Sequence, residues 1–278
     1  MSHRWIFLPL ALLAACTGTT PEPEPGPEGE PTAEPAQELS LDVADLQQQA
    51  ENITLVPSPA EMQAALEKAG LTSQLASLVG DRKISVNSDN LDQVAVRTGV
   101  VLAEIVLTVK DTPKERFAER METLKEGFKL LGAGDDIPSV IDDIVERVNN
   151  DAVSREDLLK EVDELSGVMV PELETEAGDW VVPLIQAGSW LEGSHLVASA
   201  IQAESKYGAA GALLRQPSVV DYFLSYVQRE GREKAPDEVV KQLEQTLLKL
   251  KEIAAKDALS EEDVKTIHDV TGAVLQLL

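Results

Sequence analysis

Residues 180–203 read WVVPLIQAGSWLEGSHLVASAIQA, and residues 91–109 read LDQVAVRTGVVLAEIVLTV. Both stretches are apolar around most of a helix circumference, whereas residues 113–131 and 237–255 each have a clean charged face. A helix that is apolar all round is normally buried among other helices. We therefore predict that residues 91–109 and 180–203 form the two central helices of a multi-helix bundle.

Helix start and stop signals surround these two segments. A hydroxyl residue stands three positions before an acid, as in a capping box, at Ser58 and Glu61, Thr112 and Glu115, Ser154 and Asp157, and Ser260 and Asp263. Glycines that would end a helix in the left-handed conformation follow amphipathic runs at Gly70, Gly132, Gly167 and Gly231. We expect helices over residues 41–51, 59–69, 71–79, 89–110, 113–131, 138–149, 155–166, 179–203, 206–214, 218–230, 237–255 and 261–277. Sustained strand-like alternation is missing from the sequence, so the predicted class is all-α.

The two central segments show a weak internal sequence similarity. Asp, Gly and Glu follow one another at similar spacings in both, as Asp92, Gly99 and Glu104 in the first and as Asp179, Gly188 and Glu192 in the second. The sequence therefore suggests an internal duplication, in which Gly99 and Gly188 let the two helix backbones approach closely.

The composition limits the classes of partner. The chain has 278 residues, 43% of them hydrophobic, and carries 49 acidic against 24 basic residues, for a net charge of -25. This apolar fraction is enough to bury a core, which excludes disorder of the whole chain. The acidic charge makes nucleic acid a poor partner, because phosphate contacts need cations.

The first residues have the pattern of a secretion signal. Arg4 precedes an apolar run that is too short to span a bilayer, and small residues follow it. Residues 13–16, Leu-Ala-Ala-Cys, resemble the lipobox of bacterial lipoproteins. The resemblance implies that residues 1–15 are removed and that Cys16 becomes the lipidated first residue. It also implies export to an outer membrane, with the protein facing the periplasm or the cell surface.

A spacer separates Cys16 from the helical part. Residues 17–38, TGTTPEPEPGPEGEPTAEPAQE, are rich in Pro and Glu and cannot bury enough apolar area to order themselves. We therefore divide the chain into a signal peptide at 1–15, the lipidated cysteine with its tether at 16–38, and a helical domain at 39–278.

Two polar stripes interrupt the central helices. Glu192 and His195 lie on one side of the second helix at the spacing found in di-metal bundles, but no second motif of this kind is present. Glu192 and His195 could therefore bind a metal ion, form a buried hydrogen-bonded pair, or line a small polar cleft. In the first helix, Arg97 and Glu104 are two turns apart and cannot pair directly. They mark either a solvated strip or a cleft in which Arg97 meets an anion or an acid of another helix.

Two short motifs bear a further resemblance. Residues 87–90, Asn-Ser-Asp-Asn, and residues 188–193, Gly-Ser-Trp-Leu-Glu-Gly, look similar to segments of uncharacterised secreted or lipoprotein helical proteins of bacteria. The resemblance brings no known activity. The first motif lacks the oxygen spacing of a calcium loop, and Ser88 or Asp89 as the residue that begins the first central helix explains it.

The sequence favours a membrane-anchored, non-enzymatic interaction or scaffold module with an unknown protein partner and no cofactor. The alternative is a ligand-binding or metal-binding bundle with a site between the central helices at Arg97, Glu104, Glu192 and His195. Phosphate loops and nucleophilic motifs are missing from the sequence. An enzyme that uses two carboxylates stays open as a third interpretation.

Overall fold

The computed structural model describes residues 56–278 apart from residues 73, 81, 135 and 235. Within this part of the chain all regular structure is helical, which confirms the predicted all-α class. The elements are α2 (Pro59–Ala69), α3 (Leu75–Val79), α4 (Leu91–Thr108), α5 (Lys114–Leu130), α6 (Asp136–Asn149), α7 (Arg155–Ala177), α8 (Val181–Glu204), the 3₁₀ turn η1 (Tyr207–Ala209), α9 (Ala210–Leu214), α10 (Pro217–Lys234), α11 (Asp237–Ala254) and α12 (Glu261–Leu275). The predicted signal peptide, Cys16, the tether and the helix over residues 41–51 lie outside the described residues.

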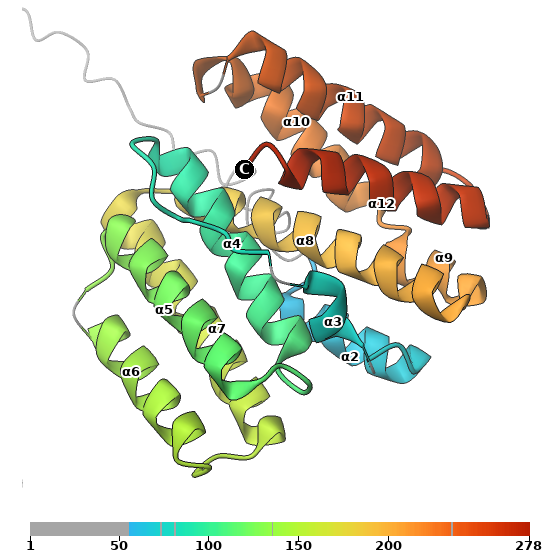
Figure 1. The fold of residues 1–278 in the computed structure, drawn as a ribbon. Coiled ribbons are helices and arrows are strands. Elements are labelled where there is room, and N and C mark those ends of the chain that lie inside the picture. Colours follow the sequence, from blue (N-terminus) through green and yellow to red (C-terminus); the bar gives the residue numbers. More distant parts are fainter. Residues whose placement is uncertain (1–55, 73, 81, 135, 235) are drawn as a thin grey trace, which may run out of the picture. The chain divides into compact units, whose positions relative to one another are not determined.

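Helices α4 and α8 form the centre of the bundle, as predicted. Almost every residue of α4 from Val94 to Thr108 is buried, and α8 is buried along most of its length from Val181 to Ile201. Figure 1 shows α5, α6 and α7 on one side of α4, and α10, α11 and α12 on the other. Each side has its own apolar cluster, one built on Phe117 and Phe128 of α5 and the other on Trp190 and Phe223. No helix in the described part of the chain combines the length and apolarity needed to cross a bilayer.

The two central helices touch at glycines. A Cβ atom on Gly99 would lie 2.0 Å from the carbonyl oxygen of Ile185, and one on Gly188 would lie 1.9 Å from the carbonyl oxygen of Val96. Across the same crossing, the hydroxyl of Ser189 donates a 2.9 Å hydrogen bond to the carbonyl of Gly99. The predicted close approach at Gly99 and Gly188 is therefore confirmed, while the duplication stays a prediction.

Three of the four predicted hydroxyl caps are present. Ser58 and Ser260 form complete capping boxes, and Ser154 accepts from the amide of Asp157. The prediction for Thr112 is wrong, because α5 begins after Pro113 and Thr112 turns inward to Thr108. The residue before α4 also differs: Asn90, and not Ser88 or Asp89, caps the helix by accepting from the amides of residues 92 and 93.

Two glycines that were expected to end helices lie inside them. Helix α7 continues beyond Gly167 to Ala177, and α10 continues beyond Gly231 to Lys234. In α7 the fully buried Leu173 lies beyond the glycine, so burial of the later turns outweighs the poor helix propensity of Gly167. Gly70 and Gly132 do adopt positive φ angles at helix ends, as predicted.

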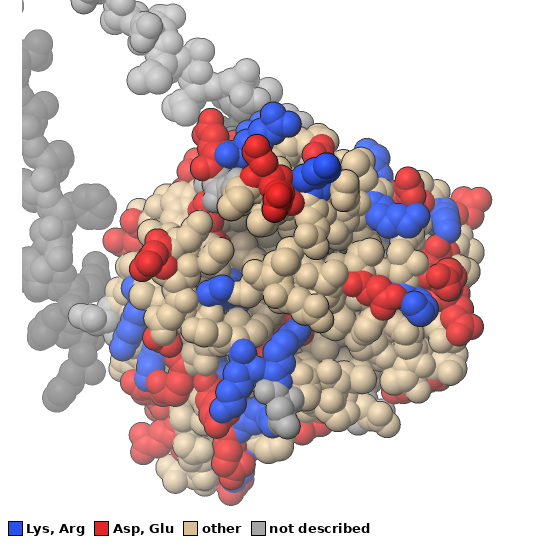
Figure 2. Space-filling view, turned by 45° about the horizontal axis from the view of Figure 1, so that its top comes forward, with Lys and Arg blue, Asp and Glu red and all other residues tan. Residues whose placement is uncertain are grey.

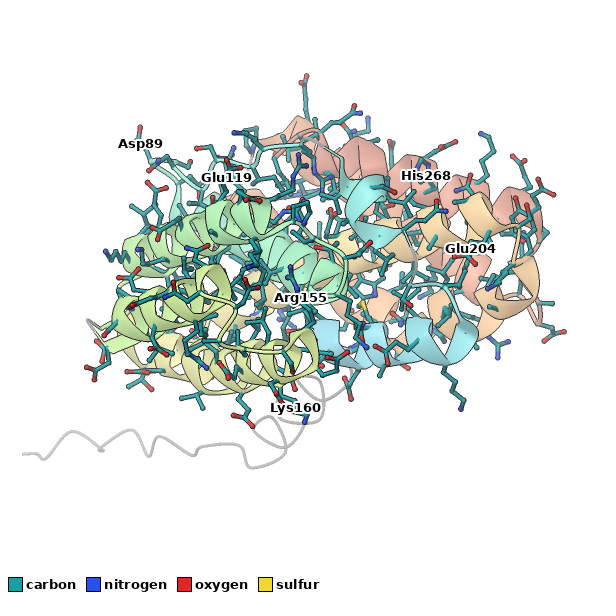
Figure 3. The ribbon with its side chains drawn as sticks, turned by 60° about the horizontal axis from the view of Figure 1, so that its bottom comes forward. Asp89, Glu119, Arg155, Lys160, Glu204 and His268 are labelled. Carbon is teal, nitrogen blue, oxygen red and sulfur yellow. The ribbon has the colours of Figure 1, made fainter. Side chains whose placement is uncertain are left out.

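An arginine ties the start of α7 to the end of α4. The guanidinium of Arg155, labelled in Figure 3, donates to the carbonyls of Val109 at 3.0 Å and Thr112 at 2.8 Å. These carbonyls lie at and just beyond the C-terminus of α4, where a cation complements the helix dipole. The contact fixes the end of α4 that lies nearest the polar cluster described below.

Candidate functional site

A buried ionic cluster joins the two central helices. Glu104 of α4 and Glu192 of α8 both accept from the guanidinium of Arg82, at 2.6 Å and 2.5 Å from its Nη2 atom. The second oxygen of Glu104 is 3.1 Å from Nε of Arg120 on α5. The side chain of Glu192 is 0% exposed and that of Glu104 is 3% exposed. The carboxylates of both central helices therefore meet inside the bundle through two arginines.

Threonines hold Arg120 in this position. Its Nη1 atom donates to the hydroxyl of Thr108 at 3.1 Å, and Thr112 donates to the same hydroxyl at 2.6 Å. Thr108 in turn donates to the backbone carbonyl of Glu104 at 2.6 Å. The inward turn of Thr112, which the capping pattern did not predict, thus completes a polar layer between α4 and α5.

The buried cluster shifts the pKa of one of its carboxyl groups, Glu192. Burial raises the pKa of Glu192 to about 7, against the lowering effect of Arg82 and with a smaller raising effect of Glu104. One oxygen of Glu192, Oε2, and the Nη2 atom of Arg120 are buried without a hydrogen-bond partner. With Glu192 ionised the four groups sum to zero charge, and with Glu192 protonated they carry one positive charge.

The predicted polar partner of Glu192 points elsewhere. The Nδ1 atom of His195 lies 3.1 Å from the carbonyl oxygen of His268 and 3.3 Å from the hydroxyl of Thr271, both on α12. The two imidazole rings stack with centroids 4.5 Å apart, and Figure 3 labels His268. Burial lowers the pKa of His195 to about 4, so this ring is neutral at pH 7.

Arg97 lies beside the stacked histidines and apart from Glu104. Its Nη1 atom donates to the backbone carbonyl of Asn87 at 3.2 Å, while its Nε atom is buried without a partner. The first of the two short motifs therefore positions Arg97 through its backbone.

These side chains border an open cleft of about 670 Å³, hereafter the cationic cleft. Its wall comes from the segment before α4, from α4 and α8, and from the second half of α12. It is lined by Arg82, Lys83, Ile84, Ser85, Arg97, His195, His268, Asp269, Gly272, Ala273, Leu275, Gln276 and Leu278. Three of these are permanent cations and one is an acid, although the chain has twice as many acids as bases.

Figure 2 shows several Lys and Arg side chains gathered in the lower centre of the view, with acidic side chains beside them and at other places on this face. The lining of the cationic cleft holds more basic than acidic side chains, which favours an anion over a cation as its occupant.

The structure therefore brings the four predicted site residues to two adjoining places. Glu104 and Glu192 share the buried cluster, Arg97 and His195 line the cationic cleft, and Arg82 belongs to both. Glu192 and His195 have partners on different elements, and the described residues contain no group of three His, Cys, Asp or Glu side chains arranged to hold a metal ion. The sequence pattern did not point to Arg82, Arg120 or His268 as residues of a site.

Comparisons with known proteins give no further assignment. No protein-family model, no curated protein sequence and no solved structure matches this chain.

Proposed function

We propose that this protein is an exported, lipid-anchored binding module whose helical domain receives a small organic anion, bearing a carboxylate or a phosphate, in the cationic cleft. The observation that carries the proposal is the gathering of Arg82, Lys83 and Arg97 around one hollow in an acidic protein. Arg97 supports it most directly, because its buried Nε atom has a hydrogen to donate and no partner.

The geometry favours binding over catalysis. The carboxylate with the raised pKa, Glu192, is fully buried and is held by Arg82, so it does not face the cleft as a free acid or base. His195 is oriented by the hydrogen bond that its Nδ1–H donates to the carbonyl of His268 and stays neutral, so its other ring nitrogen is an acceptor and the ring is not a proton donor toward the cleft.

The scaffold interpretation is the alternative, and the surface favours it less. The exposed large hydrophobic residues of the described chain are scattered over separate elements: Leu91, Leu130, Val140, Val168, Leu248 and Leu277. Scattered apolar side chains are ordinary on a protein surface, whereas an interaction face gathers them into a patch.

Titration of the purified full-length chain with acetate and with inorganic phosphate tests the cleft, with sodium chloride at equal ionic strength as the blank. We expect saturable binding that Arg97→Gln weakens about ten-fold or more, because a charge-assisted hydrogen bond contributes roughly 1.5–3 kcal/mol. Arg229→Gln is the matched control, since Arg229 is 69% exposed on α10 and pairs with the neighbouring Glu230. Equal weakening by both substitutions, or no saturable binding, would rule out the cleft as the site.

Metabolic labelling with an alkynyl fatty acid tests the anchor. Cys16 lies outside the described residues, so the anchor rests on the resemblance to the lipobox. We expect the label in the full chain and its loss in Cys16→Ala. Incorporation that survives this substitution would contradict the proposed anchor.

A further inference from the structure

A second, apolar hollow lies beside the cationic cleft. It has a volume of about 310 Å³ and lies among α4, α8, α10, α11 and α12, hereafter the apolar cavity. Its wall is mainly aliphatic and aromatic, with Leu184, Trp190, Phe223, Val240, Leu247 and Val274 among the lining residues. Gln93 and Tyr226 are among its few polar lining residues. An apolar cavity with little polar lining suits a hydrocarbon ligand.

The cavity and the cleft share a wall. Leu278 lines both hollows, while Val96 lines the cavity and the next residue, Arg97, lines the cleft. A small apolar cluster of Val100, Leu191, Val274 and Leu275, with Ile84, Leu243 and Leu278 packed against it, lies between them. The end of α12 therefore separates a cationic hollow from an apolar one by only a few side chains.

We infer that the anion received in the cationic cleft carries a single long alkyl chain, which passes Leu278 and occupies the apolar cavity. This inference rests on the proposed function and names its ligand class, a single-chain amphiphile with an acidic head group. Charge complementarity places the head group at Arg97 and Arg82, and the apolar wall receives the chain. The cavity lies at the small end of the range for ligand pockets, which suits one chain better than the two chains of a membrane lipid.

Calorimetric titration of the full-length chain with acetate, octanoate, dodecanoate and dodecyl phosphate, all below their micellar concentrations, tests this inference. We expect affinity to rise with chain length by up to about four-fold per methylene, the factor that corresponds to burial of one CH₂ group. Dodecanoate and dodecyl phosphate distinguish the two acidic head groups. Dodecanol provides the chain without the charge, and we expect it to bind more weakly than either.

Two substitutions on α11 form a matched pair. Leu243 lines the cavity, whereas Leu248 is 44% exposed and does not. Leu243→Trp should fill the cavity and abolish the dependence on chain length while leaving acetate binding intact. Leu248→Trp should bind every probe as the wild type does.

A measurement on the unaltered cavity keeps the test decisive if Leu243→Trp fails to fold. Trp190 lines the cavity, so dodecanoate brominated near its chain end should quench the fluorescence of a Trp5→Phe, Trp180→Phe chain, and bromoacetate should not. Absence of quenching by the bound chain would place the chain elsewhere and overturn the inference.

The outcomes separate the inference from the proposed function. Acetate binding with no gain from longer chains would refute the amphiphile and leave the anion site intact. Equal binding of dodecanol and dodecanoate, unaffected by Arg97→Gln, would refute the anion site, and with it the assigned head group. Failure of every probe to bind would refute both.

Discussion

Replacement of Gly188 by Ala tests whether the central helices touch backbone to backbone. The added Cβ atom would lie 1.9 Å from the carbonyl oxygen of Val96, whereas a carbon normally stays about 3.3 Å or more from such an oxygen. The opposing atom belongs to the backbone of α4 and cannot rotate away. The two helices must therefore separate by roughly 1 Å, which disturbs the packing on both sides of the crossing.

The expected loss of stability follows from two opposing effects. Overpacking of a tight core typically costs about 1–3 kcal/mol, and more where the backbone must move. Alanine in place of glycine inside a helix regains up to about 1 kcal/mol. We expect Gly188→Ala to lower the free energy of unfolding by about 2 kcal/mol or more, as measured by urea denaturation followed by circular dichroism.

The chain offers a matched control for this substitution. Gly167 lies inside α7 and is exposed, and a Cβ atom there would have no neighbour within 4 Å. Gly167→Ala should therefore raise the free energy of unfolding by about 0.5–1 kcal/mol. If both substitutions stabilised the protein equally, the contact between α4 and α8 at Gly188 would be disproved.

Three further predictions concern the cluster and the caps. The raised pKa of Glu192, about 7 against an ordinary 4.5, means that the folded protein holds a proton which the unfolded chain releases. The free energy of unfolding of the wild type, measured relative to that of Glu192→Gln, should thus fall by up to about 3 kcal/mol as the pH rises from about 4.5 to 7. A difference between the two proteins that does not change with pH would contradict the raised pKa. Arg120→Met breaks a buried pair and should cost about 3–5 kcal/mol in urea denaturation, whereas Arg229→Met, at an exposed pair, should cost less than about 1 kcal/mol. Ser260→Ala removes a capping box and should lower the free energy of unfolding by about 1 kcal/mol, with the exposed Ser225→Ala of α10 as control; equal effects would argue against the cap.

Local signals predicted the fold well where they act within a few residues. The caps at Ser58 and Ser260 mark helix starts because the hydroxyl and the amide that it accepts from are three positions apart. The same reasoning failed at Thr112 and Gly167, where contacts with other helices decide. The hydroxyl of Thr112 has partners in the polar layer, and burial of Leu173 carries α7 past the glycine.

The sequence predicted the site residues on the two central helices but not the residues that pair with them. Polar residues in an apolar helix identify Glu104, Glu192, Arg97 and His195 without any knowledge of the fold. Their partners lie far away in the chain, since Arg82 and Glu192 are separated by 110 positions. Nothing in the local sequence around Arg82 distinguishes it from a surface arginine, so only the arrangement of the helices shows that it bridges both carboxylates.

The crossing of α4 and α8 also has a consequence for how the chain folds. The hydrogen bond from Ser189 to Gly99 closes a loop of 90 positions, and the ion pair of Arg82 with Glu192 closes one of 110. Contacts of such high order form late, because the entropy of loop closure opposes them until many helices are in place. During synthesis, α4 is complete long before α8 exists, and the face of α4 that packs on α8 has no cover in that interval. A chain interrupted between α7 and α8 should therefore aggregate, and the two pieces should gain stability only when they are folded together.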